Sequence, residues 1–197
     1  MREVEVKGVV DDLVRRRRMV ERAGGKLVFA GRLEDRRYDT PERTLAQRDE
    51  VLRVRIYRDG AGARAEVDWK GATGYEDGYK VREELTVCTV GGDAPGELLE
   101  RIGYVVTRAI DRSVAQYELG GATIRFEEYP CMDILAEVEG PPEAIERAIE
   151  ALGMPRGGFT SERLPDFVAR FEARTGQRAA LCDEELAGTV RYDVRDA

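Results

Sequence analysis

Charged and apolar residues alternate in six short stretches of the chain. In the first stretch, Val4 and Val6 lie between three charged residues. Successive side chains of an extended strand point to opposite faces, so Glu3, Glu5 and Lys7 share one face of this strand. The same alternation recurs at residues 52–57, 66–70, 80–87, 124–127 and 134–139. Antiparallel strands with one face on a core alternate in this way, so the pattern predicts a half-buried antiparallel sheet whose other face is charged.

Helical spacing in the remaining chain predicts an α+β fold. The predicted helices are residues 10–23, 93–102, 142–152 and 161–175. In the first of them, Asp11 is the expected N-cap and Gly24 the expected stop. Residues 26–38 are expected to form a further strand, and residues 71–78 a loose, glycine-bearing loop.

Four consecutive arginines, residues 15–18, fall within the first predicted helix. Such a run occurs in nucleic-acid-binding proteins, but it is more often a solvated helix face, and we interpret it in that way. The formal net charge of −7 and the lack of a basic stripe studded with aromatic residues also argue against nucleic-acid binding. We therefore expect no nucleic-acid partner.

The length of 197 residues suits one domain with a substantial core. No linker or repeat divides the chain, so we expect a single domain over residues 1–176. Residues 177–197 show no clear period, which predicts a C-terminal tail that is partly mobile. No apolar run is long enough to cross a bilayer, and the first residues lack the apolar core of a signal peptide. We expect a cytoplasmic protein without a membrane partner.

The chain contains no histidine and three widely spaced cysteines, Cys88, Cys131 and Cys182. The lack of histidine excludes Ser-His-Asp and Cys-His catalytic groups and any histidine-ligated metal. The cysteine spacing indicates neither a disulfide framework nor a zinc site. Catalysis would have to depend on carboxylates, Lys, Arg, Tyr and a bound cation. Carboxylate oxygens favour magnesium or manganese.

The charged strand face allows two interpretations. In one, it faces bulk water, and ion pairs between neighbouring strands contribute little to stability. In the other, the sheet closes on itself and the charged face surrounds a charged ligand. Arg53, Arg55 and Lys70 would then offer donors to phosphate oxygens. Carboxylates on the same wall would repel phosphate unless a divalent cation bridged them. The alternation alone leaves both interpretations open.

Five short motifs follow one another along the chain. They are Glu3-x-Glu5-x-Lys7, Tyr38-Asp39-Thr40-Pro41, Leu52-Arg53-Val54-Arg55, Trp69-Lys70-Gly71 and Glu137-x-Glu139. In order and spacing, from residue 1 to residue 154, the chain resembles the CYTH superfamily, the triphosphate tunnel metalloenzymes. The resemblance implies a closed antiparallel eight-stranded β-barrel with helices packed outside and a charged tunnel within.

The resemblance also implies which residues form the site. Catalysis is expected to involve Glu3, Glu5 and Lys7. The expected triphosphate-binding residues are Lys7, Arg53, Arg55, Lys70, Arg82 and Arg112. The expected ligands of Mg²⁺ or Mn²⁺ are Glu3, Glu5, Glu127, Glu137 and Glu139.

The chain departs from the family pattern at two charged positions of the site, and its connection 128–133 differs from the usual glycine-bearing turn. Val114 stands where the family has a second basic residue after Arg112, and Arg108 could replace it only if the strand began earlier. Glu127 stands where the family has an aspartate. A smaller number of basic residues would weaken the grip on the distal phosphate of the substrate.

The residues and the resemblance together predict metal-dependent hydrolysis of a triphosphate, either inorganic tripolyphosphate or an organic triphosphate. The first alternative is a class IV adenylate cyclase, which makes cyclic AMP and pyrophosphate from ATP with the same groups. The second is a non-catalytic polyphosphate- or nucleotide-binding module, and the third is a plain interaction domain. The expected partner is a small-molecule triphosphate, and the sequence leaves a homodimer open.

Overall fold

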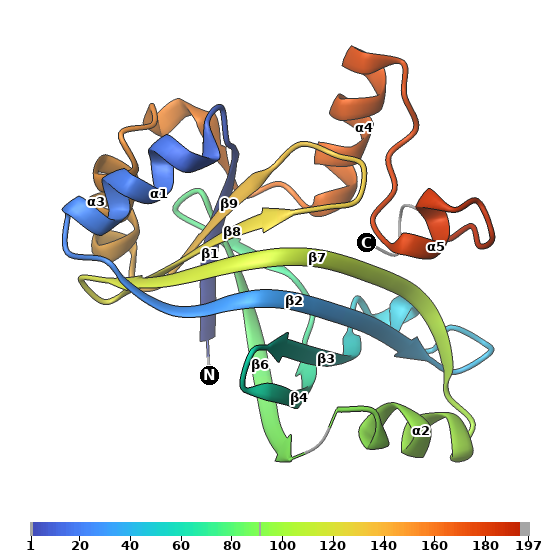
Figure 1. The fold of residues 1–197 in the computed structure, drawn as a ribbon. Coiled ribbons are helices and arrows are strands. Elements are labelled where there is room, and N and C mark those ends of the chain that lie inside the picture. Colours follow the sequence, from blue (N-terminus) through green and yellow to red (C-terminus); the bar gives the residue numbers. More distant parts are fainter. Residues whose placement is uncertain (1, 91, 194–197) are drawn as a thin grey trace.

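Strands of the computed structural model form one antiparallel sheet, and eight of them close into a barrel (Figure 1). The structure describes residues 2–90 and 92–193, without the side chains of residues 2, 3 and 90. The barrel strands are β1 (Arg2–Val9), β2 (Lys26–Asp39), β3 (Val51–Asp59), β4 (Gly62–Lys70), β6 (Tyr79–Val90), β7 (Val105–Leu119), β8 (Ala122–Glu128) and β9 (Leu135–Glu139). Their order is β1-β9-β8-β7-β2-β3-β4-β6, and β6 pairs with β1. The predicted eight-stranded barrel is confirmed.

Helices and short elements lie outside this barrel. They are α1 (Leu13–Arg22), α2 (Ala94–Arg101), α3 (Pro142–Leu152), α4 (Leu164–Thr175), α5 (Asp183–Leu186), the 3₁₀ turns η1 (Ala46–Arg48) and η2 (Arg156–Gly158), and the strands β5 (Gly74–Glu76) and β10 (Phe159–Thr160). α1 packs beside α3, and α3 covers β1, β8 and β9 (Figure 1). β10 pairs with β1, and β5 pairs with β6.

The strand β1 closes the barrel because it pairs with two neighbours. Glu5 lies opposite Lys80 of β6 on one side and opposite Glu139 of β9 on the other. Farther along the strand, Lys7 lies opposite Glu137 of β9. The motif at the start of the chain therefore lies at the seam of the barrel, where it meets charged residues from both neighbouring strands.

The apolar faces of the strands and the helix α3 form the largest core. Val6 of β1, Phe126 of β8 and Val138 of β9 are buried together with Ile145 and Ile149 of α3. Burial of this apolar surface is the main favourable term in folding. Because alternate residues of a strand face opposite ways, the same packing turns the charged residues of these strands toward the inside of the barrel.

Several element boundaries differ from the predicted ones. Asp11 is not the N-cap of α1, because Asp12 accepts the hydrogen bond from the backbone N–H of Arg15 at 2.9 Å. The fourth predicted helix begins later, at Leu164, with a proline in its first turn. Residues 71–78 are not simply a loop, because they contain β5. These differences move the ends of elements and leave their order unchanged.

The arginine run of α1 is not entirely a solvated face. Arg16 is buried, and its Nη1 donates to the carbonyl oxygens of Leu152 at 3.1 Å and Gly153 at 2.8 Å. Its Nε and Nη2 both bind Asp11 at 2.7 Å. The last carbonyls of a helix lack partners within the helix, so a cation is favourable there. Arg16 therefore joins α1 to the end of α3, and the predicted solvated face is wrong for this residue.

The C-terminal segment packs against β7. Gly176 has a φ of 68°, a left-handed conformation that ends α4. The carbonyl oxygen of Leu181 accepts a hydrogen bond from the backbone N–H of Asp111 at 2.7 Å. Glu185 of α5 forms an ion pair with the buried Arg108 at 3.0 Å. The segment up to α5 is thus anchored to the barrel, while the domain boundary at residue 176 and the partial mobility of the tail stay predictions.

The cysteines of the chain are free thiols. Cys88 is exposed, Cys131 is half-buried and Cys182 is buried. Burial raises the pKa of Cys182 to about 11, so this thiol is protonated at neutral pH. Within the described residues, no helix combines the length and the hydropathy that a bilayer span requires. The cytoplasmic location stays a prediction.

Candidate active site in the barrel

The barrel holds a cavity of about 230 Å³ that extends from the connection between β2 and β3 and the start of α4 into the barrel. At this end, Asp49 of the connection and Arg163 before α4 form an ion pair at 3.1 Å. The cationic residues deeper in the cavity are Lys7, Arg37, Arg53, Lys70, Lys80, Arg82, Arg112 and Arg125, and the acidic ones are Glu5, Asp35, Glu127 and Glu137. Charges of both signs therefore surround one space, which we call the first cavity.

A second cavity of about 240 Å³ lies farther along the same strands. Its lining residues are Arg55, Tyr57, Arg64, Glu66, Glu84, Thr86, Gln116, Arg125 and Glu139. Arg125 lines both cavities, and along β3 the wall passes from Arg53 in the first cavity to Arg55 in the second. The two cavities therefore follow one another along the inside of the barrel.

The residues of β1 belong to a chain of buried ion pairs. Lys7 Nζ lies 3.0 Å from Glu5 Oε1 and 2.7 Å from Glu137 Oε2. Glu5 also binds Lys80, and Glu137 also binds Arg125. Burial acts to raise the pKa of Glu137, but the charges of Lys7 and Arg125 outweigh it and hold this pKa well below its usual range. Glu137 is therefore ionised at neutral pH.

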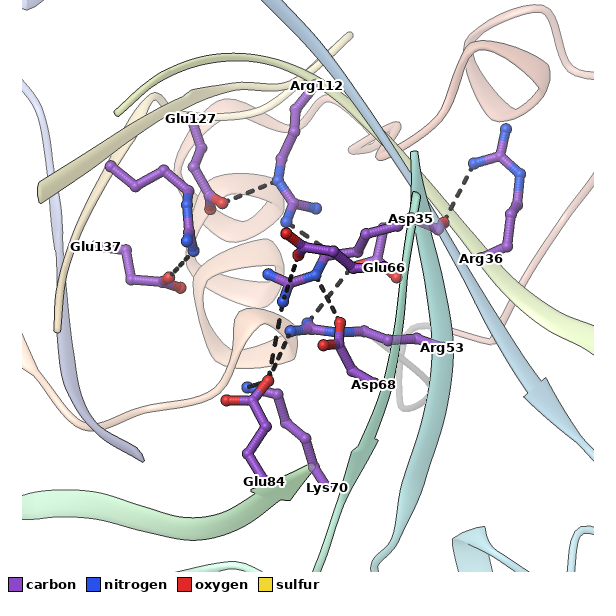
Figure 2. Close-up of polar contacts among 12 residues, drawn as sticks. Asp35, Arg36, Arg53, Glu66, Asp68, Lys70, Glu84, Arg112, Glu127 and Glu137 are labelled. Carbon is purple, nitrogen blue, oxygen red and sulfur yellow. Dashed lines mark hydrogen bonds and ion pairs between the residues drawn. The ribbon is translucent and has the colours of Figure 1, made fainter. Parts of the chain in front are cut away.

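Two arginines of β3 share one carboxylate of β4. Asp68 accepts a hydrogen bond from Arg53 Nε at 3.0 Å and another from Arg55 Nε at 2.7 Å (Figure 2). Thr86 of β6 donates its hydroxyl to the other oxygen of Asp68 at 2.7 Å. Burial acts to raise the pKa of Asp68, but the charges of Arg53 and Arg55 outweigh it and lower the pKa to about 2. Asp68 is thus a permanent anion at neutral pH.

Glu127 lies between Arg112 and Tyr129. Its Oε1 is 2.9 Å from Arg112 Nε (Figure 2), and its Oε2 accepts the hydroxyl of Tyr129 at 2.6 Å. On the other side of Arg112, Asp35 Oδ2 lies 3.8 Å from Nη2, and it also lies 3.5 Å from Arg53 Nη1. Burial acts to raise the pKa of Asp35, but the charges of Arg53 and Arg112 outweigh it and lower this pKa. Arg112 is thus flanked by two buried carboxylates.

The buried carboxylates of the first cavity fit a divalent cation. Among the described residues, Asp35 Oδ1 is a buried carboxylate oxygen without a hydrogen-bond donor. Such an oxygen destabilises a protein unless a ligand or an ion satisfies it. Carboxylate oxygens are also the ligands that Mg²⁺ and Mn²⁺ prefer. The donor set therefore suits a hard cation that binds together with an anionic substrate.

A different group of potential metal ligands lies outside the two cavities. The ligand atoms of Asp111, Cys182 and Glu184 are within 4.8 Å of one another. However, Asp111 already pairs with Arg36 at 2.7 Å and with Arg32 at 3.3 Å. The thiol of Cys182 is protonated at neutral pH, as described above. These contacts satisfy the group without an ion, and we assign no metal to it.

The structure brings most of the predicted site residues to the first cavity. They are Glu5, Lys7, Arg53, Lys70, Arg82, Arg112, Glu127 and Glu137. Arg55 and Glu139 line the second cavity instead. For Glu3 the structure describes the backbone, which pairs opposite Arg82, but not the side chain. The roles assigned to all these residues stay predictions.

Arg82 also has a local structural task at the rim of the first cavity. Its Nε donates to the carbonyl oxygen of Gly71, and its Nη2 donates to that of Asp49, both at 2.6 Å. Asp49 has a φ of 54°, and its carboxylate accepts the backbone N–H of Thr73 at 2.6 Å. Arg82 therefore holds two connections together at the rim, so part of its donor capacity is already used.

Val114, which stands where a second basic residue is expected after Arg112, lies in apolar surroundings. Val114 belongs to a buried apolar cluster with Phe29, Leu33 and Tyr57. Arg108 does not replace the missing residue, because it pairs with Glu185 and is not among the lining residues of either cavity. Arg108 therefore does not compensate, and apart from Arg112 of β7 the cations of the cavities come from other strands.

Several residues that contact the predicted site are missing from the prediction. They are Asp35, Arg37, Asp68, Lys80, Arg125 and Tyr129. Asp68, Lys80 and Arg125 lie on the charged faces of alternating strands, so the alternation could have identified them. Asp35 and Arg37 lie on β2, where both faces carry charges and the alternation is hidden. Tyr129 follows β8 and has no periodic signal.

Solved structures share this fold, whereas no protein-family model and no curated protein matches the chain. The PH1819 protein from Pyrococcus horikoshii is 24% identical with a TM-score of 0.68, over 85% of this chain and 98% of that one. A proposed adenylate cyclase from Vibrio parahaemolyticus is 20% identical with a TM-score of 0.70, over 85% and 97%. A proposed adenylyl cyclase from Hippeastrum, HpAC1, which is described as having a dominant triphosphatase activity, is 16% identical with a TM-score of 0.61, over 91% and 98%. At these identities the similarities establish the fold of the chain.

Proposed function

We propose that this chain is a divalent-metal-dependent triphosphatase of the CYTH type that holds the phosphates of its substrate in the first cavity and where that cavity meets the second. One observation carries the proposal: cationic side chains from β1, β2, β3, β4, β6, β7 and β8 converge on one cavity whose wall also carries buried carboxylates. A triphosphate needs several fixed cationic donors for its oxygens, and Arg and Lys are the side chains that supply them.

The mixture of charges favours a metal–polyphosphate complex over a bare anion. Carboxylates on the wall would repel phosphate unless a divalent cation bridged the two. Glu5, Glu127 and Glu137 would hold the cation in the first cavity, and Glu3 and Glu139 are the further candidates. A bound Mg²⁺ or Mn²⁺ would neutralise phosphate oxygens and polarise the bond that is cleaved.

The residues of the chain itself would act mainly by positioning and by charge. Lys7 and Arg125 hold the pKa of Glu137 low through their charges, so the ionised carboxylate would be available to a cation. Arg53 and Arg112, which both lie near Asp35 Oδ2, would bind phosphate oxygens. In phosphoryl transfer, catalysis depends largely on such positioning and electrostatic stabilisation.

An adenylate cyclase is the second candidate, because two of the structural neighbours are named as proposed adenylate cyclases, although a dominant triphosphatase activity is described for one of them, HpAC1. The 3′-hydroxyl of ATP would attack the α-phosphorus, and pyrophosphate would leave. The second cavity supports this candidate, since it continues the first beyond Arg125 and offers space for an organic group. Val114 in place of a basic residue instead favours a module that binds a phosphate chain without turnover.

A product assay separates these candidates. The protein is incubated with tripolyphosphate, ATP or thiamine triphosphate, each with Mg²⁺ or Mn²⁺ and with EDTA as the metal-free control. Metal-dependent phosphate release without cyclic AMP is the expected result and would rank the substrates. Cyclic AMP with pyrophosphate would instead identify a cyclase. No product, with tight binding of tripolyphosphate in calorimetry, would favour the binding module and contradict the proposed hydrolysis.

A further inference from the structure

Asp68 is a charged residue of the barrel wall for which neither proposed reaction provides a role. Its side chain is 0% exposed, so it does not touch the space of either cavity directly. It is nevertheless bound on three sides, by Arg53 Nε, Arg55 Nε and the Thr86 hydroxyl. A buried carboxylate with three hydrogen bonds has a fixed orientation, and it fixes its partners in turn.

The contacts of the two arginines divide into short and long ones. The Nε atoms bind Asp68 at 3.0 Å and 2.7 Å. The Nη atoms lie 3.4–3.9 Å from the nearest carboxylates, Asp35, Glu66 and Glu84. Distances above about 3.2 Å exceed those of well-formed N–H···O hydrogen bonds. The Nε atoms are therefore held firmly, while the Nη donors can exchange their loose contacts for phosphate oxygens.

The two arginines occupy successive positions along the inside of the barrel, where their loosely held Nη donors can meet a phosphate chain. Arg53 lines the first cavity and Arg55 lines the second, two residues farther along β3. Without a shared anion, two neighbouring inward guanidinium groups would repel each other and turn apart. Asp68 pairs across the strands with Arg53 and keeps both groups on the same wall.

We infer that Asp68 is a positioning residue for phosphate recognition, which holds Arg53 and Arg55 by their Nε atoms so that their Nη donors face a linear triphosphate chain. The inference rests on the proposed function. In this arrangement one anion, Asp68, strengthens the binding of another anion. The change in phosphate affinity on neutralising Asp68 therefore distinguishes positioning from a simple effect of charge. Removing a negative charge from an anion-binding tunnel should tighten phosphate binding if only the charge matters. If Asp68 positions the arginines, its removal should weaken binding.

The test compares Asp68→Asn with Glu66→Gln, two substitutions on β4 that each remove one inward negative charge with little change of shape. Glu66 is a matched control, because it lies 3.4 Å from Arg55 Nη2 and binds neither Nε atom. Calorimetric titration with tripolyphosphate and Mg²⁺ should give a dissociation constant at least about tenfold higher for D68N. E66Q should bind as tightly as the parent protein or more tightly. Equal or tighter binding by D68N would overturn the inference.

A second measurement tests the hydrogen bonds between Asp68 and the two arginine Nε atoms without any substrate. In protein labelled with ¹⁵N-arginine, the Nε–H signals of Arg53 and Arg55, assigned with R53K and R55K, should be protected from solvent exchange in the parent protein and lose this protection in D68N. Retained protection would overturn the inference. Protection in a parent protein that binds no tripolyphosphate would instead contradict the proposed function and leave Asp68 as a purely structural anchor. If D68N does not fold, Thr86→Val removes one bond from Asp68 and should weaken binding in the same direction, by a smaller factor; unchanged binding would overturn the inference.

Discussion

Lys7 Nζ lies 2.7 Å from Glu137 Oε2, directly across the pairing of β1 and β9. The same ammonium group lies 3.0 Å from Glu5 Oε1. One cation therefore neutralises two buried carboxylates that would otherwise repel each other. The lysine of the first motif thus has a structural task in addition to the phosphate contact assigned to it.

Replacing this lysine should destabilise the barrel and expose a cation site. In Lys7→Met, Glu5 and Glu137 each lose a buried partner, so the free energy of unfolding should fall by about 1–3 kcal/mol. The two carboxylates would then attract a divalent cation more strongly than in the parent protein. Thermal unfolding should show a larger stabilisation by Mg²⁺ in K7M than in the parent. The exposed Lys26 offers the control K26M, and an equal effect of Mg²⁺ on all three proteins would contradict the ligand role of Glu5 and Glu137.

Tyr129 should set the orientation of Glu127. The substitution Tyr129→Phe removes the hydroxyl that donates to Glu127 Oε2 and leaves the ring in place. Loss of a partner that orients a metal ligand typically weakens metal affinity by about tenfold or more. The Mg²⁺ concentration for half-maximal phosphate release should rise accordingly in Y129F. Tyr75 on β5 is exposed, so Y75F serves as the control, and the same shift in both variants would argue against a special role of Tyr129.

Acid should destabilise the barrel through its buried carboxylates. Asp35, Asp68 and Glu137 all have a pKa below the usual range in the folded chain. Their contribution to stability is therefore fully present above the unfolded pKa of about 4 and is lost as the pH falls toward the folded values. The free energy of unfolding from urea titrations should decline below about pH 4. In D68N the free energy of unfolding should decline less steeply between pH 4 and pH 2, by a slope that corresponds to about one proton fewer taken up on unfolding. Identical slopes in D68N and the parent protein would disprove the paired state of Asp68.

Arg16 should contribute to stability and not to the site. In Arg16→Met, the carbonyls of Leu152 and Gly153 at the end of α3 lose their cationic donor, so the free energy of unfolding should fall by about 2 kcal/mol. The affinity for tripolyphosphate should not change, because Arg16 lies on the outside of the barrel. Arg18 on the same helix is exposed, and R18M should be nearly neutral. Equal destabilisation by R16M and R18M would contradict the assigned contact.

The sequence predicts the barrel strands well where one face is apolar. β3, β8 and β9 carry valine, isoleucine or phenylalanine on the side that packs on helices or other apolar residues, so period-two alternation identifies their charged inner faces. On β2 this signal fails. Arg32 and Arg36 face Asp111 and the C-terminal segment on the outside, while Asp35 and Arg37 face the cavity. Because both faces of β2 carry charges, the strand shows no alternation. Its inward-facing residues therefore cannot be identified from the sequence pattern.

Side-chain contacts between segments that are distant in the sequence could not be predicted either. Arg108 is directed to Glu185, which lies in a segment without a clear period. Tyr129 reaches Glu127 only through the turn that follows β8. Asp68 shares the charged face of β4 with Glu66 and Lys70, and no local pattern indicates that it binds two arginines of the neighbouring strand. These partners follow from strand register and from packing, which a single sequence does not specify.

The most direct test of the central claim is phosphate release from tripolyphosphate by the parent protein, by the double variant Glu3→Gln with Glu5→Gln, and by Glu83→Gln. Glu83 is exposed on β6, next to the inward-facing Arg82, and serves as the matched control. The account predicts Mg²⁺- or Mn²⁺-dependent release by the parent protein and by E83Q. It predicts complete loss in the double variant, with the thermal unfolding of a folded barrel retained. Full activity of the double variant would contradict the assignment of Glu3 and Glu5 to the catalytic site.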